Sequence, residues 1–510
     1  MNTAQPKGGK MYYNKLKTKR TSKSYTYSLA DFSKGVNREI DENALSMDYA
    51  HMAYNVNYKD KSLRQGRGFS DLTSPCLFAN IDHITFHAPS KTAKPVRIWN
   101  AHITGTTSRT EKDILLIYCD DGYIYKCFIP NYASDYTKIL TGQFTSIPTV
   151  INYKYNDDFV AIICSPTDDM YIWNLDATPV KSTKNLHLTS ICSHYERLFA
   201  TTSTNKHQVR FSKNFDVTNW EETSEAGGFI ELIDERGNIN KVLSMGDYVY
   251  LIRDFGISRL SAYGDQSEFS VTHICRTSNL IYANTAAVCG DRIVYLATDG
   301  LYYCVGSNVY KYSIKINDLF DKTALNNACA CYYDGKYYLS ARLNFDDGKS
   351  VLCENETDFK NNALIEFDLQ TQKINITRGV DICAMASFVF DGWQKLAVIY
   401  NGENWQKVGE LTYDGKFFDN SAPKCWQSPE SDLGTLSQKS VRSISLISPT
   451  DVDITIKTEQ ESQTLHILGS TKLQQLVCNV KGVKVAIAIE TTSPTLHIQN
   501  LSVDIDVLDS

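Results

Sequence analysis

The sequence lacks long apolar runs and clustered metal ligands. Its longest apolar stretches, at 114–119 and 485–489, are far shorter than the roughly 18 residues of a membrane-spanning helix. The 14 cysteines include no CxxC pair and no histidine-flanked cluster with zinc spacing, and the closest two, Cys329 and Cys331, alternate along a strand. We therefore expect no membrane anchor, no metal, no cofactor and no disulfide framework, with most cysteines acting as small core residues.

Motifs for nucleotide binding and hydrolysis are also absent. The chain contains no GxxxxGK[ST] loop, HExxH helix or GxSxG elbow, and the glycine-containing segment 65–71 stops short of a dinucleotide-binding turn. Histidines and paired carboxylates are scattered or lie at hairpin tips, where turn roles dominate over acid–base work. They are His51, His83, His87, Asp120/Asp121 and Asp168/Asp169. We predict no catalytic, cofactor-binding or metal-binding residue, and no enzymatic activity.

Proline is sparse, at 12 in 510 residues, whereas tyrosine is abundant, at 31. Aromatic and β-branched side chains pack best on pleated sheets, so this composition favours strands over helices. The content of 42% hydrophobic and 22% charged residues is that of a globular protein. The length by itself predicts about three domains.

A repeat of about 47 residues runs through the middle of the chain. Each unit reads as a turn, an apolar strand, a second turn and a second strand. Seven units follow this pattern: 111–128, 155–175, 194–212, 245–263, 290–306, 333–369 and 391–411. The spacing lies between the repeat lengths of the two familiar classes of four-stranded propeller blade, about 40–45 and about 50 residues.

The turn dipeptides and the strands between them favour hairpins in stacked sheets. Asp121-Gly122 and Asp334-Gly335 reach the positive φ that tight hairpins need. The strands at 159–164 and 395–400 are apolar on both faces, as expected for strands sandwiched between neighbouring sheets. We predict an all-β fold with an about seven-bladed β-propeller over 76–425. Six or eight blades, or two or three unrelated β-sandwiches, stay open as alternatives. The tyrosines are expected on the paired strands: Tyr248, Tyr250, Tyr295, Tyr302, Tyr303, Tyr332, Tyr333, Tyr337 and Tyr338.

Three further regions flank the repeat. Residues 1–30 form a predicted basic flexible arm, 31–75 a polar lead segment with a helical patch around 43–54, and 426–510 a compact C-terminal β-sandwich. We also expect a strand at 77–88 to complete the last blade, because a terminal strand that closes a ring removes an exposed sheet edge.

The basic arm could bind nucleic acid or contact a neighbouring subunit. Seven lysines and arginines precede the first acidic residue, Asp31, and tyrosines lie among them. Such a segment can contact phosphates, but the whole chain carries a formal charge of −6, which repels DNA in general. We therefore favour an arm that orders against an acidic neighbouring subunit over one that binds DNA. No hydrophobic stretch follows the arm, so a secretory signal is not expected.

The stretch 211–220 resembles the Asp-box turn of sialidase-type propellers, S-x-D-x-G-x-x-W, in residue types but not in spacing. Ser212, Asp216 and Trp220 stand four residues apart, and the glycine is absent. Even a true Asp box is a structural hairpin turn, so we expect a structural role for this stretch.

Collinear segments of the chain resemble the β-propeller virion proteins of tailed bacteriophages and prophages, including the tail-nozzle group of short-tailed phages. Residues 32–69 resemble their opening pattern, with an Asn-Val pair at Asn55 and Val56 and a short hairpin that ends at Arg67 and Gly68. The blade consensus and the start and core strands of the final β-domain are matched by 196–220, 431–434, 439–446 and 480–490.

The resemblance implies a structural virion protein that forms part of the tail as a nozzle, ring or baseplate piece. Its implied partners are copies of itself in a ring and other tail or head-tail connector proteins, with DNA close by in a tail channel. The implied location is the virion, after assembly in the bacterial host cytoplasm. The family has no catalytic residue to transfer. This chain is shorter than the nozzle proteins.

Two other functions stay open. A glycan- or receptor-binding propeller for host attachment would use exposed aromatic residues such as Trp99, Trp393 or Trp405 to stack on sugars. A glycosidase on the same fold would need convergent carboxylates and arginines in a central pocket, and the sequence offers no recognisable set.

Overall fold

The structure is a computed structural model whose regular secondary structure is almost entirely antiparallel β-sheet. It describes residues 23–41, 44–72, 94–105, 111–128, 137–139, 143–174, 179–181, 186–223, 226–345, 356–390, 392–401, 406–418 and 420–508. The named helices in these ranges are short 3-10 segments: η2(Gln266–Glu268), η3(Asn317–Leu319), η4(Leu325–Asn327) and η5(Glu356–Asp358).

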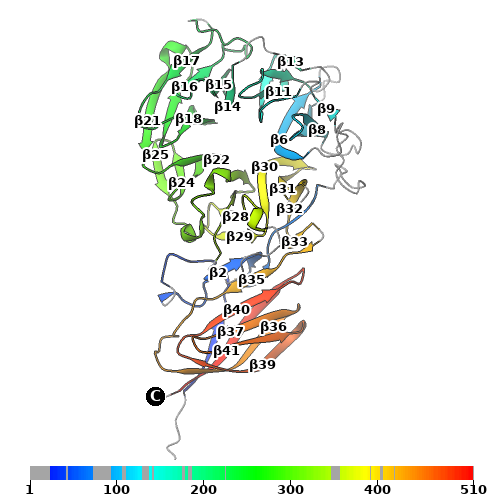
Figure 1. Ribbon diagram of the computed structural model, residues 1–510, viewed down its shortest axis with the longest axis vertical. Coiled ribbons are helices and arrows are strands. Elements are labelled where there is room, and N and C mark those ends of the chain that lie inside the picture. Colours follow the sequence, from blue (N-terminus) through cyan, green and yellow to red (C-terminus); the bar gives the residue numbers. More distant parts are fainter. Residues whose placement is uncertain are drawn as a thin grey trace, which may run out of the picture.

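Seven small sheets follow one another along the chain; the first six add their strands in sequence order, and the seventh also takes in β5 from the lead segment (Figure 1). Sheet 1 is β6(Pro95–Thr104), β7(Glu111–Cys119), β8(Ile124–Phe128) and β9(Thr137–Lys138); sheet 2 is β10(Thr149–Tyr155), β11(Asp158–Cys164), β12(Tyr171–Trp173) and β13(Val180–Lys181). Sheet 3 is β14(Leu188–His194), β15(Arg197–Thr202), β16(Gln208–Phe211) and β17(Gly228–Glu231); sheet 4 is β18(Ile239–Met245), β19(Tyr248–Arg253), β20(Gly256–Ser261) and β21(Ser270–Arg276).

The remaining sheets of the series continue in the same way. Sheet 5 is β22(Ile281–Cys289), β23(Arg292–Ala297), β24(Gly300–Val305) and β25(Asn308–Lys311); sheet 6 is β26(Cys329–Tyr333), β27(Lys336–Ala341), β28(Ala363–Asp368) and β29(Ile374–Arg378). Sheet 7 is β30(Asp381–Phe390), β31(Trp393–Asn401), β32(Gln406–Thr412), β5(Gly68–Asp71), β33(Lys416–Phe417) and β34(Asn420–Ser421). Each predicted repeat unit is the second and third strand of one sheet, which confirms the repeat.

Neighbouring sheets touch through their first strands. β6 contacts β10, and the contacts continue through β14, β18, β22, β26 and β30 before they return from β30 to β6. The strands next to these are buried on both faces, as β11, β23 and β31 illustrate. This burial explains why their sequences are continuously apolar rather than alternating.

The turn Asp334-Gly335 has the predicted chemistry, whereas at Asp121-Gly122 only the glycine has a positive φ, of 83°. Asp334 and Gly335, between β26 and β27, have φ angles of 50° and 72°. Asn156 and Asp157, between β10 and β11, have φ angles of 51° and 68°. Positive φ at both central residues matches the right-handed twist of the paired strands, and Asn, Asp and Gly reach it at low cost.

The strand that completes sheet 7 comes from the lead segment. β5 pairs antiparallel with β32, from Gly68↔Thr412 to Asp71↔Gly409. The predicted closing strand at 77–88 lies outside the described residues. Among the described residues, the strand that covers the edge of β32 is β5.

Two more sheets form the C-terminal part (Figure 1). Terminal sheet A contains β3(Val56–Lys59), β4(Ser62–Gln65), β41(His497–Val507), β36(Lys439–Ser448), β39(Ser470–Gly482) and β1(Lys23–Leu29). Terminal sheet B contains β2(Met52–Tyr54), β35(Lys424–Gln427), β40(Ala486–Thr491), β37(Val452–Lys457) and β38(Ser462–Ile467). One apolar core joins residues of both terminal sheets to residues of sheets 5 and 6, so the two parts are packed together.

Two expectations for the N-terminal region need correction. The arm does not extend to residue 30, because β1 is a regular strand over Lys23–Leu29; residues 1–22 lie outside the described ranges. The expected helical patch is wrong over its described part, 44–54, which contains turns and β2. All three side chains of β2 are buried, so pairing with β35 prevails over the local helical pattern.

Most of the described cysteines are buried, and the nine tyrosines predicted on paired strands lie there. All nine tyrosines lie on β19, β23, β24, β26 or β27. Eleven cysteines are free thiols, of which seven are buried and four are half-buried. Burial raises the pKa of the Cys164 thiol to about 12, which leaves it protonated and unreactive at neutral pH.

Candidate assembly site

The lead segment between Met52 and Asp71 connects the two parts of the molecule. Within twenty residues it supplies β2 to terminal sheet B, β3 and β4 to terminal sheet A, and β5 to sheet 7. Together with the shared apolar core, the contacts of this segment hold the C-terminal sheets against the seven-sheet part.

Asn55 fixes the point where the lead segment passes sheet 6. Its backbone has a φ of 58°, a left-handed conformation that asparagine tolerates better than most residues. Its amide Nδ2 donates to the carbonyls of Arg378, at 3.2 Å, and Pro423, at 2.7 Å. Its Oδ1 accepts from the N–H of Arg378 at 2.9 Å. One side chain thus joins β29 of sheet 6 to the start of β35 in terminal sheet B.

Arg67 forms a buried ion pair with Glu366 on β28. Arg67 Nε lies 2.5 Å from Glu366 Oε2, and both side chains are less than 5% exposed. Arg67 Nη2 also donates to the hydroxyl of Tyr338 at 2.7 Å, and Lys336 Nζ lies 2.5 Å from the other carboxylate oxygen. The ring of Tyr413 covers the guanidinium, with its centroid 3.6 Å from the guanidinium carbon.

The charges of this cluster compensate for its burial. Burial alone would raise the pKa of Glu366, but the cations of Arg67 and Lys336 outweigh that effect and hold the pKa below its usual value. Glu366 therefore stays ionised and keeps both cations in place.

Gly68, the residue after Arg67, has no room for a side chain, because a Cβ there would collide with Asp414 and with the backbone of Lys416.

β1 lies along β41 at an edge of terminal sheet A. The register runs from Lys23↔Val507 to Leu29↔Leu501, and β4 pairs with the earlier part of the same strand. On the outer face, Ser24 Oγ donates to Asp506 and Thr26 Oγ1 donates to Asp504, both at 2.7 Å. Ser443 of β36 donates to the other oxygen of Asp504 at 2.6 Å. Two aspartates thus fasten the N-terminal strand.

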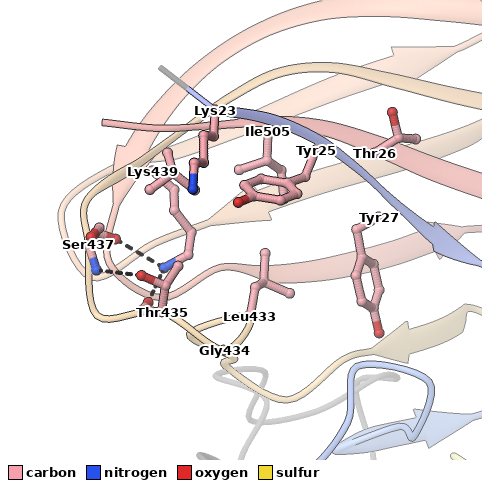
Figure 2. A pocket seen from close by; sticks show the side chains of 11 residues that line it. Lys23, Tyr25, Thr26, Tyr27, Leu433, Gly434, Thr435, Ser437, Lys439 and Ile505 are labelled. Atoms are coloured by element: carbon pink, nitrogen blue, oxygen red, sulfur yellow. Dashed lines mark hydrogen bonds between the residues drawn. The ribbon is translucent and has the colours of Figure 1, made fainter. Parts of the chain in front are cut away.

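The opposite face of β1 lines a cavity of about 510 Å³. Figure 2 shows Tyr25 and Tyr27 projecting from β1 toward the side where Leu433 lies. Lys439 closes another side, where its ammonium donates to the carbonyls of Thr435 and Val483, both at 2.6 Å. Burial lowers the pKa of Lys439. Because its ammonium is held by backbone carbonyls, Lys439 has a structural role in the wall of the cavity.

β39 forms the other edge of terminal sheet A. Within the described residues it pairs with β36 alone. Near its end the N–H groups of Asn479 and Lys481 donate to side chains of the loop before β38 and of β38 itself. Its earlier part carries Leu473 and Val477 on the outside, which are 66% and 81% exposed. An edge strand of 13 residues with exposed apolar side chains is a surface on which another strand can pair.

The aromatic residues proposed for sugar stacking are not brought together as a site. Trp99 is half-buried and packs against the core between sheets 1 and 2. Trp393 is 74% exposed at the turn between β30 and β31. Trp405 lies outside the described residues.

The other candidate residues act in turns. In the stretch that resembles an Asp box, Ser212 Oγ accepts from the N–H of Leu198, Asp216 accepts from Thr218, and the indole of Trp220 donates to the carbonyl of Val217. This agrees with the expected structural role.

The carboxylates at hairpin tips also accept hydrogen bonds from nearby residues: Asp120 from the N–H of Lys94, Asp121 from Tyr123 and Tyr125, and Asp168 from Thr145 and Ser165. His51 contacts Arg38, whereas His83 and His87 lie outside the described residues.

Sequence reasoning missed Asp504, Asp506 and Glu366. The two aspartates alternate in the last strand, and this period of two was a signal that both lie on one face. Glu366 stands between apolar residues of a strand, which marks a buried charge that needs a partner. The sequence contains no local sign that this partner is Arg67.

Neither a metal site nor a membrane helix was found in the part of the chain that is described. No group of three or more histidines, cysteines or acidic residues there is placed to hold a metal ion. None of the helices there has the length and apolar character needed to cross a bilayer.

No protein-family model matches the chain, and no curated protein matches it. Among solved structures, the chain is similar to PorZ, a surface component of the type-IX secretion system of Porphyromonas gingivalis, with 8% identity and a TM-score of 0.36 over 73% of this chain and 45% of PorZ. It is similar to the extracellular domain of BT4673 from B. thetaiotaomicron, with 9% identity and a TM-score of 0.40 over 91% of this chain and 64% of that one. Hsv2p of Kluyveromyces lactis gives 8% identity and a TM-score of 0.30 over 52% of this chain and 81% of that one. The chain thus spans less than two thirds of the first two structures. These similarities assign no function.

The Arg67–Glu366 pair is testable by Arg67→Met, which keeps an apolar stem but removes the cation. We expect the free energy of unfolding to fall by about 3 kcal/mol, because breaking a buried ion pair leaves a buried carboxylate, here with Lys336 as its remaining cation. Chemical denaturation measures the change. The matched control is Arg276→Met, whose pair with Glu235 is more than half exposed and should contribute under about 1 kcal/mol. Equal losses in the two variants would contradict a special role for Arg67.

The attachment of β1 should depend on pH through Asp504. Hydrogen bonds from Ser443 and Thr26 hold the pKa of Asp504 below its ordinary value of 3.8. The stabilisation is therefore complete above pH 3.8 and is lost as the pH falls through the lowered pKa. Hydrogen exchange of residues 23–29, corrected for intrinsic rates, should show less protection in Asp504→Asn than in the wild type at pH 7, with the difference shrinking below pH 3.8. Equal protection of the two proteins at pH 7 would refute this attachment.

Proposed function

We propose that the chain is a structural virion protein of a tailed phage and forms part of the tail. In this proposal the seven sheets are the blades of a seven-bladed β-propeller, and the two terminal sheets form a C-terminal β-sandwich. The contacts that return from β30 to β6 support a closed ring of blades. The pairing of β5 with β32 supports it further, because a strand from a distant part of the chain covers the edge of the last blade.

The residues that carry the resemblance to phage tail proteins support the same proposal. Asn55 and Arg67 make contacts that join the lead segment to sheet 6, and Gly68 leaves no room for a side chain beside Asp414 and Lys416. The segment 196–220 spans β15, β16 and the turn closed by Trp220, and 439–446 is most of β36, an interior strand of terminal sheet A. The matching positions therefore support the frame of the molecule rather than a catalytic site.

The observation that carries the proposal is the exposed edge of β39, with Leu473 and Val477 on its outer face. Terminal sheet A has β39 at one edge, and β1 and the β3–β4 hairpin beside β41 at the other, so the sheet presents two different edges. Pairing of β39 in one copy with β1 in the next is a head-to-tail contact, and such contacts close into a ring when the rotation between copies allows it. The partners are further copies of this chain and neighbouring tail or connector proteins. The role requires no enzymatic step and no cofactor.

This assembly is testable with the double variant Leu473→Lys, Val477→Lys. Both side chains are exposed, so the variant should fold normally, but two charges at the edge of β39 should prevent pairing with another copy. Light scattering coupled to size-exclusion chromatography should give an oligomer for the wild-type chain and a monomer for the variant.

The matched control is Val180→Lys, which places a lysine at a 61% exposed valine on β13, far from β39 in the sheet order. It should keep the wild-type oligomer. A wild-type chain that stays monomeric at every concentration measured, or a double variant that still assembles, would count against the proposal.

A further inference from the structure

Exposed aromatic rings gather on turns of sheets 3 and 4 and on β17, none of which belongs to the assembly site. Tyr263 and Phe215 are 68% and 69% exposed, and Tyr195 and Phe229 are 44% and 40% exposed. Tyr195 and Tyr263 contact each other edge to face, with ring centroids 5.1 Å apart. Single exposed aromatic residues are ordinary on a protein surface, but a group of them marks a binding surface.

The rings line two neighbouring cavities. The smaller, of about 190 Å³, is lined by Tyr195, Phe215 and Tyr263. The larger, of about 480 Å³, is lined by Phe229 together with other residues of sheet 3 and the 265–269 segment. Arg197 lies between them: it lines the smaller cavity, and its guanidinium lies over the rings of Phe211 and Phe269, which line the larger one. Together the two cavities form what we call the aromatic groove.

Two of the rings stand on strained backbone. Tyr195 has a φ of 49° and Phe215 a φ of 56°, in the left-handed region where bulky side chains are uncommon. The Phe215 ring is mostly exposed, so the fold gains little from a phenylalanine at a position that glycine would occupy with less strain. Strained, exposed residues of this kind are typical of ligand-binding positions, where the backbone conformation presents the side chain.

The polar groups of the aromatic groove suit hydroxyl donors. The larger cavity carries the carboxylates of Glu222 and Asp265 and the amide of Gln266, and the smaller carries Glu196 and Asn214. Carboxylates and amide oxygens accept hydrogen bonds from hydroxyl groups, while aromatic faces pack against apolar C–H groups. A carbohydrate presents both kinds of group on one ring.

The charge of the aromatic groove favours an uncharged ligand. Glu222 is paired with Arg210, and Asp265 is held by the N–H of Ser267 at 2.8 Å with the cation of Arg197 nearby. Since these carboxylates and the neighbouring guanidiniums offset each other's charge, neither a cationic nor an anionic ligand is strongly favoured, while the carboxylates still accept hydrogen bonds from hydroxyl groups. From these observations we infer that the aromatic groove binds a neutral oligosaccharide. This site uses residues other than those of the proposed tail assembly and stands independently of it.

The test begins with the full-length chain on a glycan array that displays neutral and sialylated oligosaccharides, with a lysine-rich peptide as a further probe. We expect binding to a neutral oligosaccharide. Isothermal titration with that oligosaccharide should then show at least about tenfold weaker binding for Tyr263→Ala and for Phe215→Gly. Phe215→Gly should not lower the melting temperature, because glycine accepts the φ of this position.

The control is Trp393→Ala, which removes a similarly exposed ring from sheet 7 and should leave affinity unchanged. The inference is overturned if the wild-type chain binds no neutral oligosaccharide, or if it binds the sialylated glycans or the peptide in preference. It is also overturned if Tyr263→Ala and Phe215→Gly bind as well as the wild type.

Discussion

The buried ion pair between Arg67 and Glu366 is the interaction on which the rest of the arrangement depends. It links the end of the β3–β4 hairpin to the middle of sheet 6, across 299 residues of sequence. From this fixed point the lead segment runs one way into both terminal sheets and the other way into sheet 7 as β5. A buried pair contributes little net stability but strongly disfavours arrangements that would separate its charges. It therefore selects one position of the C-terminal sheets relative to the seven-sheet part.

A molecule fixed in this way can present two surfaces at constant separation. Terminal sheet A offers its edges to other copies, and the aromatic groove lies between sheets 3 and 4 on the seven-sheet part. In the proposed tail role, the first surface builds the particle and the second meets carbohydrate. A rigid connection suits both tasks, because neither surface then has to be ordered when its partner binds.

Features of the fold that depend on neighbouring residues could be predicted from the sequence, whereas features that depend on pairing between distant strands could not. Turns such as Asp334-Gly335 and apolar strands such as β11 are encoded within a few residues, so the seven hairpin units could be recognised. The attachment of β1 to β41 joins residues 482 positions apart, and no local sequence pattern predicts it. Residues 44–54 suggested a helix because their local pattern cannot reveal that Met52–Tyr54 pair with β35. The aromatic groove was missed for a similar reason: its rings come from four separate segments of sheets 3 and 4, and exposure cannot be read from sequence.

The central claim, that this chain is a structural subunit of a phage tail, is tested most directly by imaging. Electron cryo-microscopy of purified particles that carry a tagged copy of the chain should show the tag at repeated, symmetric positions on the tail. Purified particles without the tag, together with the tagged chain only in particle-free fractions, would contradict the claim.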